Sequence, residues 1–293
     1  MPVVEAMMIP ANDLEHRVLA WPRGRARTSA PARPVFLVHG YMDAAATWEA
    51  VAEDLALAGH TVFAPDMRGL GDGARAPRGS YYHFPDYVFD LADIVDAVAP
   101  NEPIALVGHS MGGTVATMYA GAFPERVVRL ANVEGLGPPN SEWDHAPIRM
   151  RSWIEQVRKV RALEASAPTL SWDEARSRLA KNHPRVPAEV LDRWLPALAR
   201  EVGEGRVVWR FDPLHRTVSP TPFFAQLFQE YARRVTCPVL FVSGGPTGFH
   251  PDDEDARLAC FAELERRTIE DAGHMLHWTK PAALAAALTA FFG

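Results

Sequence analysis

The stretch that decides the fold is Ile104-Ala105-Leu106-Val107-Gly108-His109-Ser110-Met111-Gly112-Gly113. An apolar run typical of a buried parallel strand ends here in the pattern G-x-S-x-G and leads into a helical pattern that Pro124 closes. A strand, a sharp turn and a helix in this order form a nucleophile elbow, which holds a serine hydroxyl where a base can reach its proton. The stretch therefore predicts that Ser110 is a nucleophile.

The glycines around Ser110 have a physical reason. In such a turn the backbones come too close for a Cβ at Gly108 and Gly112, and Gly113 lets the helix lie against the sheet. The five-residue pattern also occurs in ordinary turns, so the flanking strand and helix carry the interpretation.

Outward from the elbow, short β-type runs alternate with helical patterns, which predicts an α/β fold with a mainly parallel sheet. The strand candidates are Val35 to Val38, Thr61 to Phe63, Ile104 to Val107, Val127 to Val133, Val239 to Val242 and Arg267 to Glu270. The helix candidates are Trp48 to Ala58, Phe84 to Val98, Met111 to Phe123, Ala256 to Leu264 and Pro281 to Phe292.

The alternation breaks between Gly137 and about Val235, where prolines separate helical pieces and no strong strand pattern intervenes. We expect a helical cap over 138–235, inserted into a core domain of 1–137 and 236–293. In the first cap helix Trp153, Val157 and Leu163 share an apolar face, which predicts packing on the core, with substrate contact as the alternative.

Composition narrows the function classes. The 293 residues are 48% hydrophobic, and the net charge of -6 includes no basic stripe, so we expect a small-molecule substrate and no nucleic-acid partner. The longest apolar stretch, Ala282 to Phe292, is too short for a membrane span, and the amino terminus lacks the basic start of a secretory signal. A soluble cytoplasmic protein is expected; the oligomeric state stays open.

Three further segments complete a set of motifs around the elbow. Phe36 to Tyr41 is similar to a strand followed by a His-Gly turn, Pro65 to Gly69 to the loop after the next strand, and Asp271 to His274 to a loop that carries a catalytic histidine. In this order the motifs resemble the α/β-hydrolase superfamily. Tyr81 to Tyr87, Asn132 to Pro139 and His274 to His277 look like serum hydrolase-like and related bacterial serine hydrolases. The resemblance implies an eight-stranded sheet flanked by helices and a hydrolase activity.

The catalytic base is predicted to be His274, because it follows the last strand candidate and precedes the last helix candidate. The acid has two candidate positions. Most of the superfamily places an aspartate after the strand that here ends at Val242, yet this loop has no carboxylate before Asp252 and Asp253. Glu134 lies at the end of the strand after the nucleophile helix, as the acid does in some members. A carboxylate at the end of an apolar strand needs a partner, which favours Glu134; a structural role for it stays open.

Two backbone N–H groups, those of Tyr41 and Met111, are predicted to form the oxyanion hole. His39 and Asp66 are expected to brace neighbouring turns, and His109 is given no catalytic role. His274 and His277 are three residues apart, but no other ligand has metal-site spacing, and no dinucleotide or phosphate motif occurs. No metal and no cofactor are therefore expected.

These residues predict acyl transfer through a covalent serine intermediate, with a carboxylesterase acting on a small to medium apolar ester as the leading activity. Carbon–carbon, lactone or amide hydrolysis with the same triad is an alternative. A different class of alternative is a ligand-binding protein on the same fold with negligible turnover.

Overall fold

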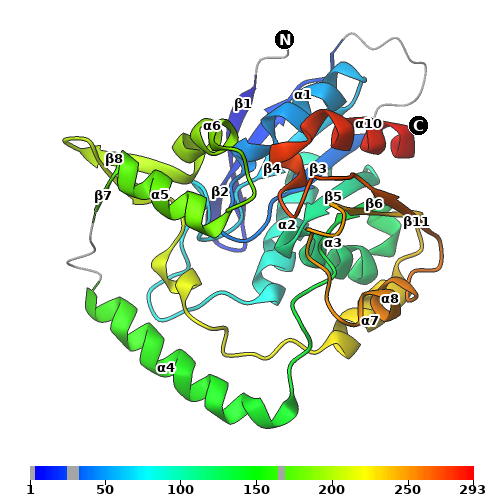
Figure 1. The fold of residues 1–293 in the computed structure, drawn as a ribbon. Coiled ribbons are helices and arrows are strands. Elements are labelled where there is room, and N and C mark those ends of the chain that lie inside the picture. The colour runs from blue at the N-terminus through cyan, green and yellow to red at the C-terminus, as the bar shows by residue number, and fades with distance from the viewer. Residues whose placement is uncertain (1–3, 25–32, 164–168) are drawn as a thin grey trace.

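The structure is a computed structural model that describes residues 4–24, 33–163 and 169–293. Residues 1–3 and 25–32 of the predicted core range and 164–168 of the predicted cap range lie outside the described residues. Eight strands form one sheet in the order β1-β2-β4-β3-β5-β6-β10-β11 (Figure 1). They are β1 (Glu5–Ala11), β2 (Leu14–Trp21), β3 (Pro34–Val38), β4 (Thr61–Pro65), β5 (Ile104–His109), β6 (Val127–Val133), β10 (Val239–Ser243) and β11 (Leu264–Thr268). All neighbouring pairs from β4 to β11 are parallel, and β1 and β2 add an antiparallel edge, which confirms the predicted mainly parallel eight-stranded sheet.

Helices cover both faces of this sheet, and the two-residue period of the strands decides which side chains meet them. Phe36 and Val38 of β3 belong to the apolar cluster that includes α2 (Phe84–Val98), α3 (Met111–Ala122) and α7 (Ala225–Arg234). Val35 and Leu37 belong to the cluster with α1 (Glu49–Leu57) and α10 (Pro281–Phe292). The remaining short helices of the core are α8 (Glu254–Leu258) and α9 (Leu276–Thr279). Each central strand is therefore buried on both faces, as its continuous apolar run indicates.

Among the described elements of the core, β1, β2, β11 and α8 differ from the predicted ones. β1 and β2 form a hairpin that was absent from the predicted strands; its two turn residues, Asn12 and Asp13, have positive φ values of 48° and 58°. β11 begins at Leu264 rather than Arg267, because Leu264 pairs with Val239 of β10. The preceding helix α8 ends correspondingly early, before the chain turns into the strand.

The sequence predicts a helical insertion, but the insertion between β6 and β10 also contains strands. Its elements before α7 are α4 (Ala146–Leu163), β7 (Leu170–Ser171), α5 (Trp172–Asn182), α6 (Ala188–Leu198), β8 (Ala199–Gly203) and β9 (Arg206–Trp209). β7, β9 and β8 form a small antiparallel sheet. The sequence pattern does not predict these strands, because they are two to five residues long and most of β8 is exposed, so no apolar alternation marks them.

The predicted apolar face of α4 is only partly used for packing. Val157 is buried and Trp153 meets the ring of Tyr81 edge-on, with 5.4 Å between ring centroids, but Leu163 is exposed. Helix α7, which the predicted cap range includes, packs closely on α3: a Cβ on Gly121 would lie 2.3 Å from the Tyr231 carbonyl oxygen. The last helix of the insertion thus covers the main sheet.

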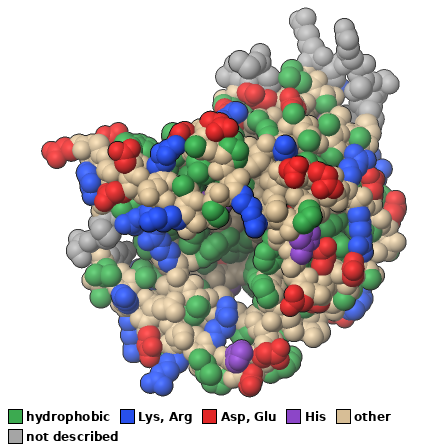
Figure 2. Space-filling view, in the orientation of Figure 1, with side chains coloured by type: hydrophobic (Ala, Val, Ile, Leu, Met, Phe, Trp, Pro, Cys, Tyr) green, Lys and Arg blue, Asp and Glu red, His purple; other side chains and the backbone are tan. Residues whose placement is uncertain are grey.

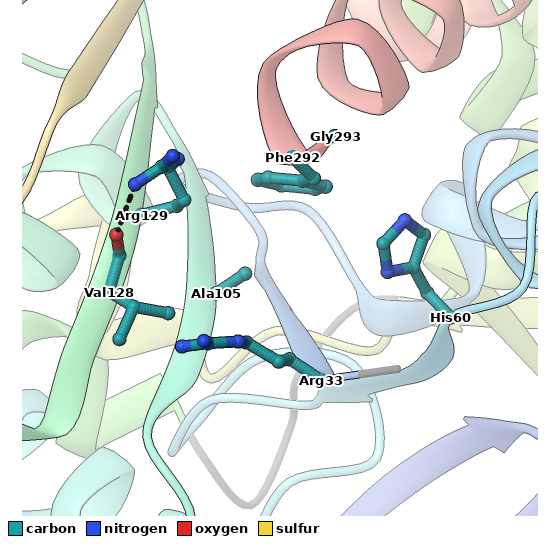
Figure 3. A pocket seen from close by; sticks show the side chains of 7 residues that line it. All are labelled: Arg33, His60, Ala105, Val128, Arg129, Phe292 and Gly293. Carbon is teal, nitrogen blue, oxygen red and sulfur yellow. Dashed lines mark hydrogen bonds between the residues drawn. The ribbon is translucent and has the colours of Figure 1, made fainter. Parts of the chain in front are cut away.

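The two ends of the parallel strands differ in what they hold. At the amino ends, a cavity of about 190 Å³ is lined by side chains that include Arg33, His60 and Arg129 (Figure 3). Ser110 follows β5 at the opposite, carboxyl end, where the functional site lies. Among the described residues, every helix is too short or too polar to traverse a lipid bilayer.

Candidate active site

Ser110 stands on a strained turn between β5 and α3. Its φ of 52° and ψ of -118° are sparsely populated for a residue with a side chain, and its N–H donates to the Val133 carbonyl at 2.9 Å. A Cβ on Gly108 would lie 2.2 Å from the Gly112 carbonyl oxygen, and one on Gly112 would lie 2.2 Å from the Val38 carbonyl oxygen. The flanking glycines are thus required by close backbone approach.

His274 lies between Ser110 and Glu134. The distance from its Nε2 to Ser110 Oγ is 3.0 Å, and the distance from its Nδ1 to Glu134 Oε2 is 2.8 Å. With the Nδ1–H donating to the carboxylate, Nε2 is free to accept the serine proton. The histidine side chain is 32% exposed, whereas the glutamate side chain is fully buried. In this arrangement the three side chains can act as a nucleophile, a base and an orienting acid.

The carboxylate of Glu134 is held by more than the histidine. Its Oε1 accepts the Gly244 N–H at 2.6 Å, and its Oε2 also accepts the Phe249 N–H at 2.7 Å. A Cβ on Gly248 would lie 1.8 Å from Oε1, so only glycine fits beside the carboxylate there. Backbone donors and the histidine together satisfy a buried charge that would otherwise be costly.

The other two candidate acids lie elsewhere. Asp252 is exposed, and Asp253 forms an ion pair with Arg257 at 2.7 Å. In the described part of the chain, neither makes a hydrogen bond to His274. Of the three candidates, the structure brings Glu134 alone to the histidine.

The predicted oxyanion donors flank the serine. Met111 is the first residue of α3, where a helix leaves its N–H without an intrahelical acceptor. Tyr41 follows Gly40, whose added Cβ would lie 3.2 Å from Ser110 Cβ. Within the described ranges, neither the Tyr41 nor the Met111 N–H donates to a protein acceptor, so both are free to meet an oxyanion.

His39 and Asp66 brace the surrounding loops, the role predicted for both. The His39 Nδ1–H donates to the Gly40 carbonyl at 2.8 Å, and its Nε2 accepts the Met67 N–H at 3.0 Å. Asp66 accepts a hydrogen bond from the Ala45 N–H at 2.8 Å and forms an ion pair with Arg17 at 2.6 Å. The turn that leads to Tyr41 is thereby fixed.

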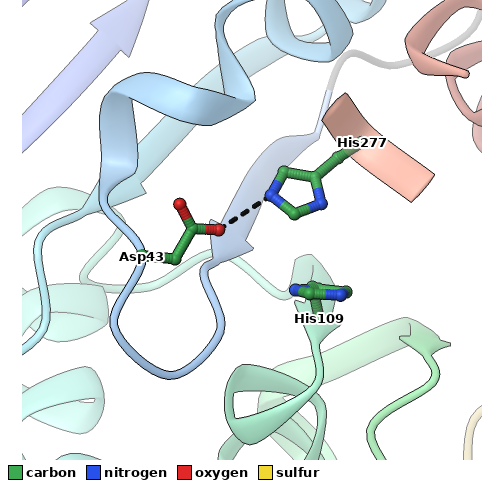
Figure 4. Close-up of side chains that lie close together, drawn as sticks. All are labelled: Asp43, His109 and His277. Carbon is green, nitrogen blue, oxygen red and sulfur yellow. Dashed lines mark hydrogen bonds and ion pairs between the residues drawn. The ribbon is translucent and has the colours of Figure 1, made fainter. Parts of the chain in front are cut away.

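A second polar cluster lies directly behind His274. His109 Nε2 donates to the His274 carbonyl at 2.7 Å, and His277 Nε2 donates to Asp43 Oδ2 at 2.8 Å (Figure 4). The ring centroids of His109 and His277 are 4.5 Å apart. Asp43, His109 and His277 each offer one potential metal ligand atom within 4.8 Å of the others, a grouping that sequence spacing does not reveal.

Burial controls the charges of this cluster. Burial, reinforced by the neighbouring His277 and His274, lowers the pKa of His109 well below its ordinary value, so this ring is neutral. Burial alone would raise the pKa of Asp43, but the hydrogen bond and charge of His277 outweigh it and lower that pKa. Neutral His109 can therefore donate one proton to the His274 carbonyl without adding a positive charge beside the base.

A cavity of about 500 Å³ opens above Ser110, a volume typical of small-molecule sites. The space-filling view shows the molecule hollowed at its centre, with hydrophobic side chains inside the hollow (Figure 2). Six tyrosine and phenylalanine side chains belong to its described lining: Tyr41, Tyr81, Tyr82, Phe84, Tyr87 and Phe249. The site is thus suited to an apolar substrate chain.

Sequence reasoning missed the groups that hold the acid and shape the cavity. Sequence reasoning on the loop 244–249 considers only its lack of a carboxylate, and its glycines at 244, 245 and 248 are the signal that could have pointed to close backbone approach. The sequence predicts no role for Arg149, whose place in the cavity lining follows from the fold of the insertion. No local pattern could have shown it.

Known proteins of similar sequence and structure indicate the family of this chain. The chain is 30% identical over 190 residues to a serine hydrolase-like protein of Danio rerio; the match covers 64% of this chain and 58% of that protein, so the chain spans about three fifths of this relative. It is 28% identical over 278 residues to the esterase Rv0045c of Mycobacterium tuberculosis, covering 94% of this chain and 87% of the relative. A solved structure of the hypothetical protein PA1622 from Pseudomonas aeruginosa has a TM-score of 0.83 at 26% identity, covering 99% of each chain.

A family model described as the alpha/beta hydrolase fold matches residues 33–281, which include the elbow, Glu134 and His274. The chain belongs to the α/β-hydrolase family.

Proposed function

We propose that this hydrolase is a carboxylesterase that transfers an acyl group through a covalent intermediate on Ser110. The observation that carries the proposal is the unbroken path of hydrogen bonds from Ser110 Oγ through His274 to Glu134. Such a path raises the nucleophilicity of a serine that is otherwise a weak nucleophile at neutral pH.

Each step uses groups already in position. His274 Nε2 accepts the serine proton while Oγ attacks the ester carbonyl carbon, and Glu134 stabilises the imidazolium. The oxyanion accepts the N–H groups of Tyr41 and Met111. His274 then donates its proton to the leaving alcohol, activates a water, and the water releases the acid from Ser110.

Two further observations support an ester as the substrate. The aromatic cavity above the serine favours an apolar acyl or alcohol group. Among the relatives, the one from Mycobacterium tuberculosis is named an esterase.

Hydrolysis of 4-nitrophenyl esters from acetate to long acyl chains, measured for the wild type and Ser110→Ala, tests the proposal. Turnover that the variant loses by ~10^5-fold or more, with its circular dichroism unchanged, is expected for a triad nucleophile. Ester turnover that survives in Ser110→Ala contradicts a serine mechanism. A folded wild type without ester turnover would instead favour carbon–carbon or amide cleavage, or ligand binding alone.

A further inference from the structure

The cavity above Ser110 holds one cation that the proposed chemistry does not use. Among the described residues that line it, Arg149 is the single lysine or arginine and Glu134 the single carboxylate. Glu134 is fully engaged by the Gly244 and Phe249 N–H groups and by His274. In the described ranges no ion pair joins Arg149 to an acid. Its charge thus has no internal counter-ion.

The guanidinium is held in place yet keeps donors free. Arg149 lies in the first turns of α4, is half-buried, and donates its Nε–H to the Ser219 carbonyl at 2.8 Å. Its terminal nitrogens have no hydrogen-bond partner among the described residues. Burial raises the pKa of the Tyr81 hydroxyl, and the charge of Arg149 is one of the groups that oppose this rise, which places the guanidinium near that wall of the cavity.

The surroundings of Arg149 favour an anionic ligand. Six of the described residues that line the cavity are tyrosine or phenylalanine, so a charge pair formed there is screened less than one in open water. A guanidinium presents its donors in a planar fork that matches the two oxygens of a carboxylate. A carboxylate is also ionised at neutral pH, when the arginine is charged.

We propose that Arg149 binds a carboxylate carried by the acyl chain, so that the preferred substrates are esters of dicarboxylic acids with one acid group free. This inference rests on the proposed esterase function. The apolar chain occupies the aromatic part of the cavity, its ester carbonyl reaches Ser110, and its free carboxylate meets Arg149 on the side formed by the insertion.

The test compares matched esters. The 4-nitrophenyl monoesters of adipic, pimelic and suberic acid carry a free carboxylate, and the corresponding 4-nitrophenyl methyl diesters do not. The ratio of kcat/KM for each charged ester to that for its neutral partner is measured for the wild type and Arg149→Gln, after correction for uncatalysed hydrolysis. A charge-assisted hydrogen bond predicts that the ratio falls ~10- to 100-fold in the variant, through KM of the charged ester.

Arg151→Gln is the matched control. Arg151 lies two residues further along α4, its side chain is 82% exposed, and it pairs with Glu155, so its loss changes the net charge equally without touching the cavity. The ratio is expected to stay at the wild-type value in this variant. Added NaCl is expected to lower the wild-type ratio and to leave that of Arg149→Gln nearly unchanged. An equal ratio in the wild type and Arg149→Gln overturns the proposal, as does an equal loss on both esters, which marks a structural role.

A binding measurement separates this inference from the esterase function. Calorimetry with suberate and the Ser110→Ala protein is expected to show binding that the double variant Ser110→Ala/Arg149→Gln loses. Turnover of the charged esters with no dependence on Arg149 overturns the inference and leaves the esterase function standing. Suberate binding through Arg149 without any ester turnover supports the subsite and removes the esterase function.

Discussion

Replacing Glu134 by glutamine removes the charge beside His274 and preserves nearly the same shape. The two carboxylate oxygens both accept backbone donors: Oε1 accepts the Gly244 N–H, and Oε2 accepts the Phe249 N–H and the His274 Nδ1–H. A glutamine offers one oxygen and one NH₂ group. Whichever way the amide turns, its NH₂ faces a backbone N–H inside a buried site.

Two effects of different size follow. Leaving a buried donor unsatisfied is expected to lower the free energy of unfolding by ~1–3 kcal/mol. Loss of the charge that orients His274 and stabilises its imidazolium is expected to lower kcat by ~10^4-fold. This corresponds to a rise of ~5.4 kcal/mol in the activation free energy. Activity therefore falls much further than stability.

Urea unfolding and kcat on a neutral 4-nitrophenyl ester measure the two effects on the same protein. Asp253→Asn is the control, because Asp253 pairs with Arg257 and makes no hydrogen bond to His274 among the described residues. It is expected to keep kcat near the wild-type value. The reasoning is refuted if Glu134→Gln stays within tenfold of the wild type, or if Asp252→Asn or Asp253→Asn abolishes turnover.

Three further predictions concern the neighbouring groups. His109→Leu removes the N–H that donates to the His274 carbonyl and is expected to lower kcat ~10-fold at unchanged KM. His109→Gln can donate from a similar position and is expected to retain most of kcat. Equal losses in both variants contradict a role of His109 in positioning His274. Gly40→Ala places a Cβ 2.7 Å from His109 Nδ1 and 3.2 Å from Ser110 Cβ, so a loss of ~100-fold in kcat is expected in ester assays, and a fully active variant speaks against this crowding. Burial lowers the pKa of His215 from 6.5 to about 4. As the pH falls, the histidine is therefore protonated in the unfolded chain before it is protonated in the folded protein. The free energy of unfolding is expected to decrease by up to ~3 kcal/mol between pH 6.5 and 4. Urea unfolding across this pH range measures the decrease, which is expected to be smaller in His215→Gln. If the free energy of unfolding falls equally with pH in that variant, the role of His215 is disproved.

The sequence predicts much of the fold near Ser110 because the local constraints there are strong. A continuous apolar run can be satisfied only by burial on both faces, and the glycines around Ser110 mark contacts that exclude a Cβ. The same reasoning selects Glu134, since a charge at the end of a buried strand needs a partner. These inferences depend on the chemistry of single residues and their immediate neighbours.

The features that sequence reasoning missed depend on contacts between distant segments. Asp43 lies in the loop after β3, His109 ends β5 and His277 lies in α9, so the three meet only after the sheet has formed. The strands of the insertion are short and most of β8 is exposed, so pairing with one another, rather than apolar alternation, fixes them. Arg149 likewise reaches the cavity through the path of the insertion.

The loop 244–249 donates two backbone hydrogen bonds to the carboxylate of Glu134 and also supplies Phe249 to the cavity lining. Any remodelling of this loop therefore alters substrate fit and turnover together. Helix α4 supplies Arg149 to the cavity lining, and none of its described hydrogen bonds reaches Ser110, His274 or Glu134. If the proposed function holds, substitutions in α4 can change substrate preference while the contacts among Ser110, His274 and Glu134 stay intact, which makes α4 the natural place to begin a change of specificity.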